Sequence, residues 1–133
     1  MDRKVLVADV PEVQARVAAV LAHERLVFVH TLAAARSALA RDDFDLVLIG
    51  MHFDDSRMFD LLRAVRAGGR NRSVRVACYR LRPFAFMALS TQGIEVTVKA
   101  LGASVFADLA SYANQQEGDR ALVRLVAAAT ESG

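Results

Sequence analysis

Five short apolar runs, each followed by a segment with helical periodicity, constrain the fold of this chain more than any other feature. The runs cover residues 4–8, 26–29, 44–49, 74–79 and 104–107. Between the first two, apolar residues recur at the spacing that gathers side chains on one helix face, as Val13, Val17, Val20 and Leu21 do. Strands that alternate with helices are typical of a parallel sheet with covering helices, so we expect an α/β fold.

Right-handed crossovers and five strands predict a doubly wound parallel sheet of flavodoxin-like order 2-1-3-4-5, with helices on both faces. Thr31 and Ser56 suit the N-caps of two of these helices, and Gly68 with Gly69 suits a helix end. The ligand crevice of such a sheet lies at the carboxyl ends of strands one and three. We therefore expect Asp9 and Gly50 to lie side by side.

Length and composition narrow the class of protein. A chain of 133 residues suits one compact domain over residues 1–133. No apolar run reaches the roughly 18 residues of a membrane span and the start lacks a signal peptide, so we expect a cytoplasmic protein. The single cysteine, Cys78, has no Cys/His neighbours at metal-site spacing. We expect no metal and no cofactor.

Residues 44–67 carry a more specific pattern. They read FDLVLIGMHFDDSRMFDLLRAVRA, which resembles, without a gap, the third strand and following helix of the receiver domains of bacterial response regulators. Residues 5–13, VLVADVPEV, are similar to the family's first strand with its acidic pair, and residues 101–103, LGA, are similar to its step into strand five. The resemblance covers nearly the whole chain and implies a CheY-like receiver fold.

The resemblance also implies which positions would carry phosphoryl transfer, and most of them hold other residues here. The acceptor aspartate is replaced by Gly50, and only Asp9 remains of the acidic pair that holds a divalent cation. The hydroxyl position falls on Cys78 and the lysine position near Leu109. The comparison therefore predicts a pseudo-receiver, not an enzyme, that acts in two-component-type signalling by binding another signalling protein or a second copy of itself.

Three features near the crevice leave alternatives open. His52 with Asp54 and Asp55 could form a substitute phosphorylation or metal site, although a polar loop is expected there in any case. Asp9 could instead cap the following helix. Cys78 could be a redox-sensitive thiol, although a free cysteine is more often a small buried hydrophobe.

Two surface features suggest partners. No acidic residue occurs from Leu61 to Ile94, while arginines recur through that stretch, which suggests a nucleic-acid interface as an alternative function. These residues are Arg63, Arg66, Arg70, Arg72, Arg75, Arg80 and Arg82. A long connection after the fourth strand also carries apolar side chains that could form an interaction surface or fill the core. These are Phe84, Phe86, Met87 and Leu89.

Overall fold

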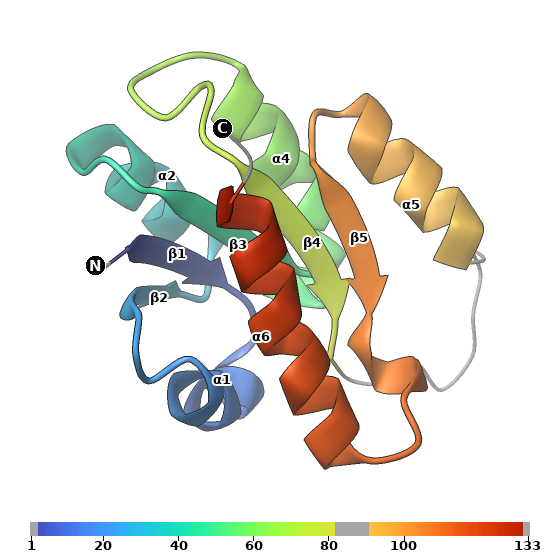
Figure 1. The fold of residues 1–133 in the computed structure, drawn as a ribbon. Coiled ribbons are helices and arrows are strands. Elements are labelled where there is room, and N and C mark those ends of the chain that lie inside the picture. The colour runs from blue at the N-terminus through green and yellow to red at the C-terminus, as the bar shows by residue number, and fades with distance from the viewer. Residues whose placement is uncertain (1–2, 82–90, 132–133) are drawn as a thin grey trace.

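The computed structural model describes residues 3–81 and 91–131, and these form a five-stranded sheet with helices on both faces (Figure 1). The strands are β1 (Lys4–Ala8), β2 (Arg25–Val29), β3 (Leu46–Gly50), β4 (Val76–Arg80) and β5 (Val105–Asp108). All neighbouring pairs are parallel and the order is β2-β1-β3-β4-β5. The predicted doubly wound fold of order 2-1-3-4-5 is confirmed.

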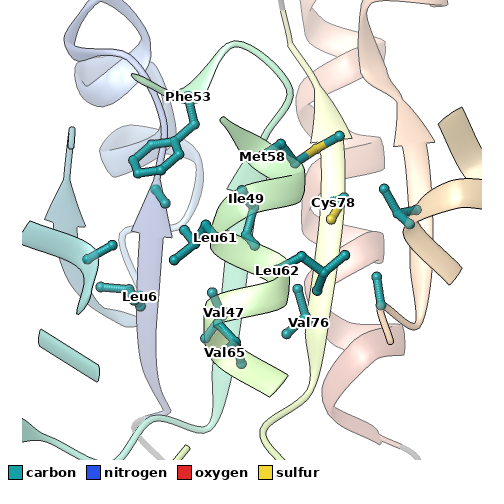
Figure 2. Close-up of a cluster of buried hydrophobic side chains, with 14 of the residues drawn as sticks. Leu6, Val47, Ile49, Phe53, Met58, Leu61, Leu62, Val65, Val76 and Cys78 are labelled. Carbon is teal, nitrogen blue, oxygen red and sulfur yellow. The ribbon is translucent and has the colours of Figure 1, made fainter. Parts of the chain in front are cut away.

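The helices form two layers, each with its own core. The elements between the strands are η1 (Pro11–Val13), α1 (Gln14–Val20), α2 (Leu32–Arg41), α3 (Phe53–Ser56), α4 (Met58–Arg66), α5 (Thr91–Ala100), η2 (Leu109–Ser111) and α6 (Gln115–Glu131). In Figure 1, α1 and α6 lie in front of the sheet, and α2 and α4 behind it. Figure 2 shows Leu61, Leu62 and Val65 of α4 against the strand residues Val47 and Val76. β3 is buried on both faces, which explains why its sequence, LVLIG, is apolar throughout.

The structure confirms one of the two predicted helix N-caps, Thr31, and contradicts the other, Ser56. The Thr31 hydroxyl accepts a hydrogen bond from the Ala34 amide at 3.1 Å, so its N-cap role is confirmed. The N-cap prediction for Ser56 is wrong, because Ser56 has a left-handed φ of 65° and α4 begins after Arg57 without a side-chain cap. α4 ends at Arg66, just before Gly68 and Gly69, as predicted. Among the described residues, no helix combines the length and apolarity that crossing a membrane would require.

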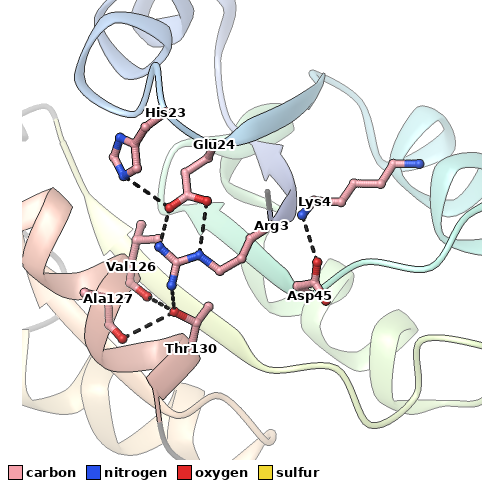
Figure 3. A network of polar contacts seen from close by, with 8 residues as sticks. All are labelled: Arg3, Lys4, His23, Glu24, Asp45, Val126, Ala127 and Thr130. Carbon is pink, nitrogen blue, oxygen red and sulfur yellow. Dashed lines mark hydrogen bonds and ion pairs between the residues drawn. The ribbon is translucent and has the colours of Figure 1, made fainter. Parts of the chain in front are cut away.

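A buried ion-pair network ties the start of the sheet to the last helix (Figure 3). Arg3 Nε donates to Glu24 Oε1 at 3.1 Å, and its two terminal nitrogens donate to Glu24 Oε2 and Thr130 Oγ1. The Glu24 side chain is only 1% exposed, and His23 Nε2 lies 3.2 Å from its Oε2. The hydrogen bond from Arg3 lowers the pKa of Glu24, against the opposing effect of burial. The network therefore stabilises the fold only while Glu24 is ionised.

We expect Glu24→Gln to lower the free energy of unfolding by about 2 kcal/mol at pH 7, since it leaves Arg3 without its carboxylate. Because the folded pKa of Glu24 lies below its unfolded value, the contribution is present above about pH 4.3 and is lost as the pH falls through the folded pKa. Urea unfolding at pH 7 and at low pH measures both effects. The control is Asp60→Asn, whose pair with Arg63 is 55% and 59% exposed. A pH-independent difference between wild type and Glu24→Gln would contradict this account.

Candidate functional site

Residues from four strands meet at the carboxyl edge of the sheet. Asp9 follows β1, and Gly50 ends β3. In the strand register Gly50 pairs with Tyr79, and Arg80 of β4 pairs with Asp108 of β5. The parallel arrangement brings these residues from distant parts of the chain to one edge, which is where ligands bind to sheets of this type. This edge is the candidate site.

Asp9 fills the space that a side chain on residue 50 would need. A Cβ built on Gly50 would lie 2.2 Å from Asp9 Cγ and 2.2 Å from Asp9 Oδ2. Asp9 is only 5% exposed, and its Oδ1 accepts a hydrogen bond from the Val10 amide at 2.7 Å. Asp9 and Gly50 therefore lie side by side, as predicted, and the Asp9 carboxyl group packs directly against Gly50. Asp9 bonds the adjacent amide and does not cap the first turn of η1 or α1.

Tyr79 is the hydroxyl-bearing residue beside Gly50, and the sequence analysis missed it. Its side chain is fully buried, and its Oη forms no hydrogen bond of standard geometry. Burial raises the pKa of Tyr79 well above its usual value, and the negative charge of Asp9 raises it further. The phenol therefore stays protonated and faces a carboxylate. One signal was available, because Tyr79 is the sole hydroxyl-bearing residue in the strand sequence VACYR.

Cys78 lies on the other face of the strand from Tyr79. Its side chain is fully buried in the apolar cluster between the sheet and helices α2, α4 and α5, and Figure 2 places it on β4 near Leu62. Burial raises the pKa of the Cys78 thiol to about 12. A buried, protonated thiol lacks the exposed thiolate that redox reactivity requires, so the structure favours the packing role.

An ion pair occupies the edge where β4 and β5 end. Arg80 Nε and Nη2 donate to the two carboxylate oxygens of Asp108 at 2.9 and 2.8 Å. The side chains are 12% and 13% exposed, and Asp108 Oδ1 also accepts from the Ala110 amide at 3.2 Å. Leu109, near which the resemblance places the family's lysine, is buried in the apolar cluster between the sheet and helices α1 and α6. Arg80 of β4 is thus a cation at this edge, and both oxygens of Asp108 bind it.

The loop after β3 is hydrogen-bonded to the first turn of α2. Asp54 Oδ2 accepts a hydrogen bond from the Leu32 amide, in the first turn of α2, at 2.8 Å. Asp54 and Asp55 have left-handed φ angles of 43° and 57°, continuing to Ser56. His52 and Asp54 are partly buried, whereas Asp55 is exposed. Within residues 3–81 and 91–131, no three His, Cys, Asp or Glu side chains are grouped so that they could hold a metal ion.

The arginine run does not form one uniform surface. Arg66 donates to the carbonyls of Gly102, Arg72 and Val74, and burial lowers its pKa. Arg63 pairs with Asp60, Arg70 pairs with Asp43 at 3.7 Å, and Arg80 pairs with Asp108. The nucleic-acid alternative stays a prediction that a gel shift at low salt can test, since such binding weakens steeply with salt. Arg82, Phe84, Phe86, Met87 and Leu89 lie outside the described residues.

Comparison with known proteins places the fold. No protein-family model matches the sequence, and no curated protein does. Solved structures do match. The phosphorylated cyanobacterial phytochrome response regulator RcpA is 12% identical with a TM-score of 0.77, over 100% of this chain and 97% of its own. A response regulator from Hahella chejuensis is 23% identical with a TM-score of 0.77, over 98% of each chain.

This chain has the receiver-domain fold. A third match is the receiver domain of a sensor histidine kinase from Pseudomonas aeruginosa PAO1, which has a magnesium ion coordinated in its active-site cleft. It is 20% identical with a TM-score of 0.65, over 95% of this chain and 98% of its own. Identities this low establish the receiver fold, and function has to be argued from the residues at the candidate site.

Proposed function

We propose that this chain is a signalling domain that acts by binding another protein, without phosphorylation of an aspartate and without enzymatic activity of its own. The observation that carries the proposal is the contact between Asp9 and Gly50. A receiver of the ordinary kind needs an acceptor carboxylate at the end of β3, and here the carboxylate of Asp9 fills the adjacent space.

The other residues at this edge support the same interpretation. Phosphoryl transfer requires positioned cations that neutralise the charge developing on the phosphate oxygens. Arg80 is already held by both oxygens of Asp108, and Leu109 is apolar. The cyanobacterial protein is phosphorylated, and the Pseudomonas domain coordinates magnesium. In this chain, the Asp9 carboxylate that could bind a hard cation already accepts a hydrogen bond from the Val10 amide. The remaining role for a receiver fold is recognition of a partner.

Acetyl phosphate with magnesium tests the proposal directly. We expect the intact mass of the protein to stay unchanged, because Gly50 has no side chain and Asp9 is buried. We also expect beryllofluoride, which mimics a bound phosphoryl group, to leave the amide signals of Asp9, Gly50 and Tyr79 unshifted in an NMR spectrum. A receiver domain with an intact acceptor aspartate, treated in parallel, is the positive control. A stoichiometric phosphoryl adduct would refute the proposal.

A further inference from the structure

The loop after β3, residues 51–57, contains a strained stretch of backbone. Across residues 3–81 and 91–131, the residues other than glycine with positive φ are Asp54, Asp55 and Ser56, at 43°, 57° and 65°. A left-handed conformation brings the Cβ of an L-residue close to the following carbonyl oxygen, which costs free energy at each position. Aspartate tolerates this conformation singly, whereas three such residues in succession are rare. Contacts with the rest of the fold must therefore hold this stretch in place.

One apolar anchor and one hydrogen bond hold the strained residues. Phe53 precedes them, and its side chain is fully buried in the cluster between the sheet and helices α2, α4 and α5 (Figure 2). Asp54 Oδ2 accepts the hydrogen bond from the Leu32 amide. Asp55 and Ser56 are exposed, and in the part of the chain that the structure describes their side chains make no hydrogen bond or ion pair. The bond between Asp54 and Leu32 is thus the polar contact that ties these side chains to another element.

This hydrogen bond stabilises the start of α2. Leu32 is the first residue of α2, so its amide has no acceptor within the helix. The Thr31 hydroxyl binds the amide of Ala34, and the Asp54 carboxylate binds the amide of Leu32. A negative charge at this place also meets the partial positive charge of the helix N-terminus. The stabilisation of α2 therefore offsets the backbone strain in the loop.

The sequence favours a second conformation of the same loop. Serine is a preferred N-cap residue, and an N-cap residue has an extended backbone. Ser56 is left-handed instead, and α4 begins without a side-chain cap. If residues 54–56 return to negative φ, the strain is relieved, and the Ser56 hydroxyl accepts a hydrogen bond from the amide of Met58 or Phe59. The same change breaks the hydrogen bond between Asp54 and the first turn of α2.

We propose that the loop after β3 is a two-state switch. In the held state, which is the one observed, Asp54 binds the Leu32 amide and residues 54–56 are left-handed. In the released state these residues have negative φ, Ser56 caps α4, and the Leu32 amide loses its acceptor. The switch is a property of this chain alone. Its use in signalling rests on the proposed protein-binding function, because a partner shifts the balance only if it binds the two states with different affinities.

Hydrogen exchange of the Leu32 amide measures the released state, because Asp54 protects this amide only in the held state. Glycine adopts the left-handed conformation without strain and remains an acceptable N-cap residue. Ser56→Gly should therefore slow exchange of the Leu32 amide by about tenfold, although the substitution lies outside α2. Asp55→Gly should slow it as well. The matched control is Ala67→Gly, because Ala67 is exposed and has an ordinary φ of −67°, and exchange of the Leu32 amide should stay unchanged.

Removal of the hydrogen bond tests the opposite direction. Asp54→Ala should move the backbone chemical shifts of Asp55 and Ser56 from left-handed to negative-φ values, and it should protect the amide of Phe59 as Ser56 caps α4. Asp54→Asn keeps an acceptor oxygen without the charge, so it should give a mixture of the two states, and it serves if Asp54→Ala does not fold. Asp60→Asn makes the same change of charge at an exposed position of α4 and should leave the loop unaltered.

The outcomes separate this inference from the proposed function. Unchanged or faster exchange of the Leu32 amide in both glycine variants would overturn the switch, since strain would then not oppose the contact with Asp54. Left-handed chemical shifts that persist at Asp55 and Ser56 in Asp54→Ala would also overturn it, because the strained residues would not need the hydrogen bond. The mass measurement with acetyl phosphate does not depend on this loop. A phosphoryl adduct would therefore refute the proposed function and leave the switch standing.

Discussion

Gly50→Ala is expected to lower the free energy of unfolding by about 3 kcal/mol, the upper part of the usual cost of overpacking a well-packed core. The added Cβ would lie 2.2 Å from Asp9 Cγ, so the Asp9 side chain has to leave its buried position and its bond to the Val10 amide. Gly50→Asp should destabilise the protein more, because it also places a second carboxylate beside a buried one. Urea denaturation monitored by circular dichroism measures both.

A double-mutant cycle identifies the cause. Asp9→Ala removes the carboxylate, so the double variant Asp9→Ala/Gly50→Ala has room for the new methyl group. We expect Gly50→Ala to cost at least about 1 kcal/mol less in the Asp9→Ala background than in the wild type. Additive effects of the two substitutions would show that the contact between Asp9 and Gly50 does not set the cost.

Arg80→Met is expected to destabilise the fold by about 3 kcal/mol, because it removes the guanidinium that binds both oxygens of the largely buried Asp108 carboxylate. Asp108 is 13% exposed and receives both hydrogen bonds from Arg80. The double variant Arg80→Met/Asp108→Leu should recover much of the loss, since apolar replacements of a buried pair are often well tolerated. Thermal and urea unfolding of the single and double variants provide the comparison.

Arg63→Met is the matched control for this second experiment. Its partner Asp60 is 55% exposed, and the pair lies on the surface of α4. Exposed ion pairs contribute about 0–1 kcal/mol, so this variant should stay close to the wild type. Equal losses for Arg63→Met and Arg80→Met would mean that burial of the Arg80–Asp108 pair has no energetic consequence.

The sequence predicted the sheet well because its three central strands, β1, β3 and β4, are buried on both faces. Apolar runs interrupted by helical periodicity determine the number and direction of strands, and the right-handed crossover rule then leaves few topologies. The proximity of Asp9 and Gly50 followed from strand order alone. The strand order could not predict that the Asp9 side chain turns over Gly50, because that depends on a side-chain direction.

Residue-level roles were predicted less well, and the reason is geometric. Successive side chains of a strand point to opposite faces, so a shift of one residue exchanges the two faces of the sheet. The sequence comparison placed Cys78 beside the acceptor position, whereas the register places Tyr79 there. Ser56 was predicted as an N-cap from its residue type, but the left-handed backbone from Asp54 to Ser56 delays the start of α4. The conformational preferences of single residue types predict neither which face of a strand a side chain occupies nor where a helix begins.

The hydrogen bond from the Leu32 amide to Asp54 connects the position of α2 to the loop after β3. This hydrogen bond joins the loop after Gly50 to the first turn of α2, and Leu39 and Ala40 in the later turns of α2 line a hollow together with Ala64 and Gly68. A helix of 10 residues is a stiff rod about 15 Å long. A displacement of the loop at one edge of the sheet would therefore move the first turn of α2, and a rigid helix would transmit that movement to its other end.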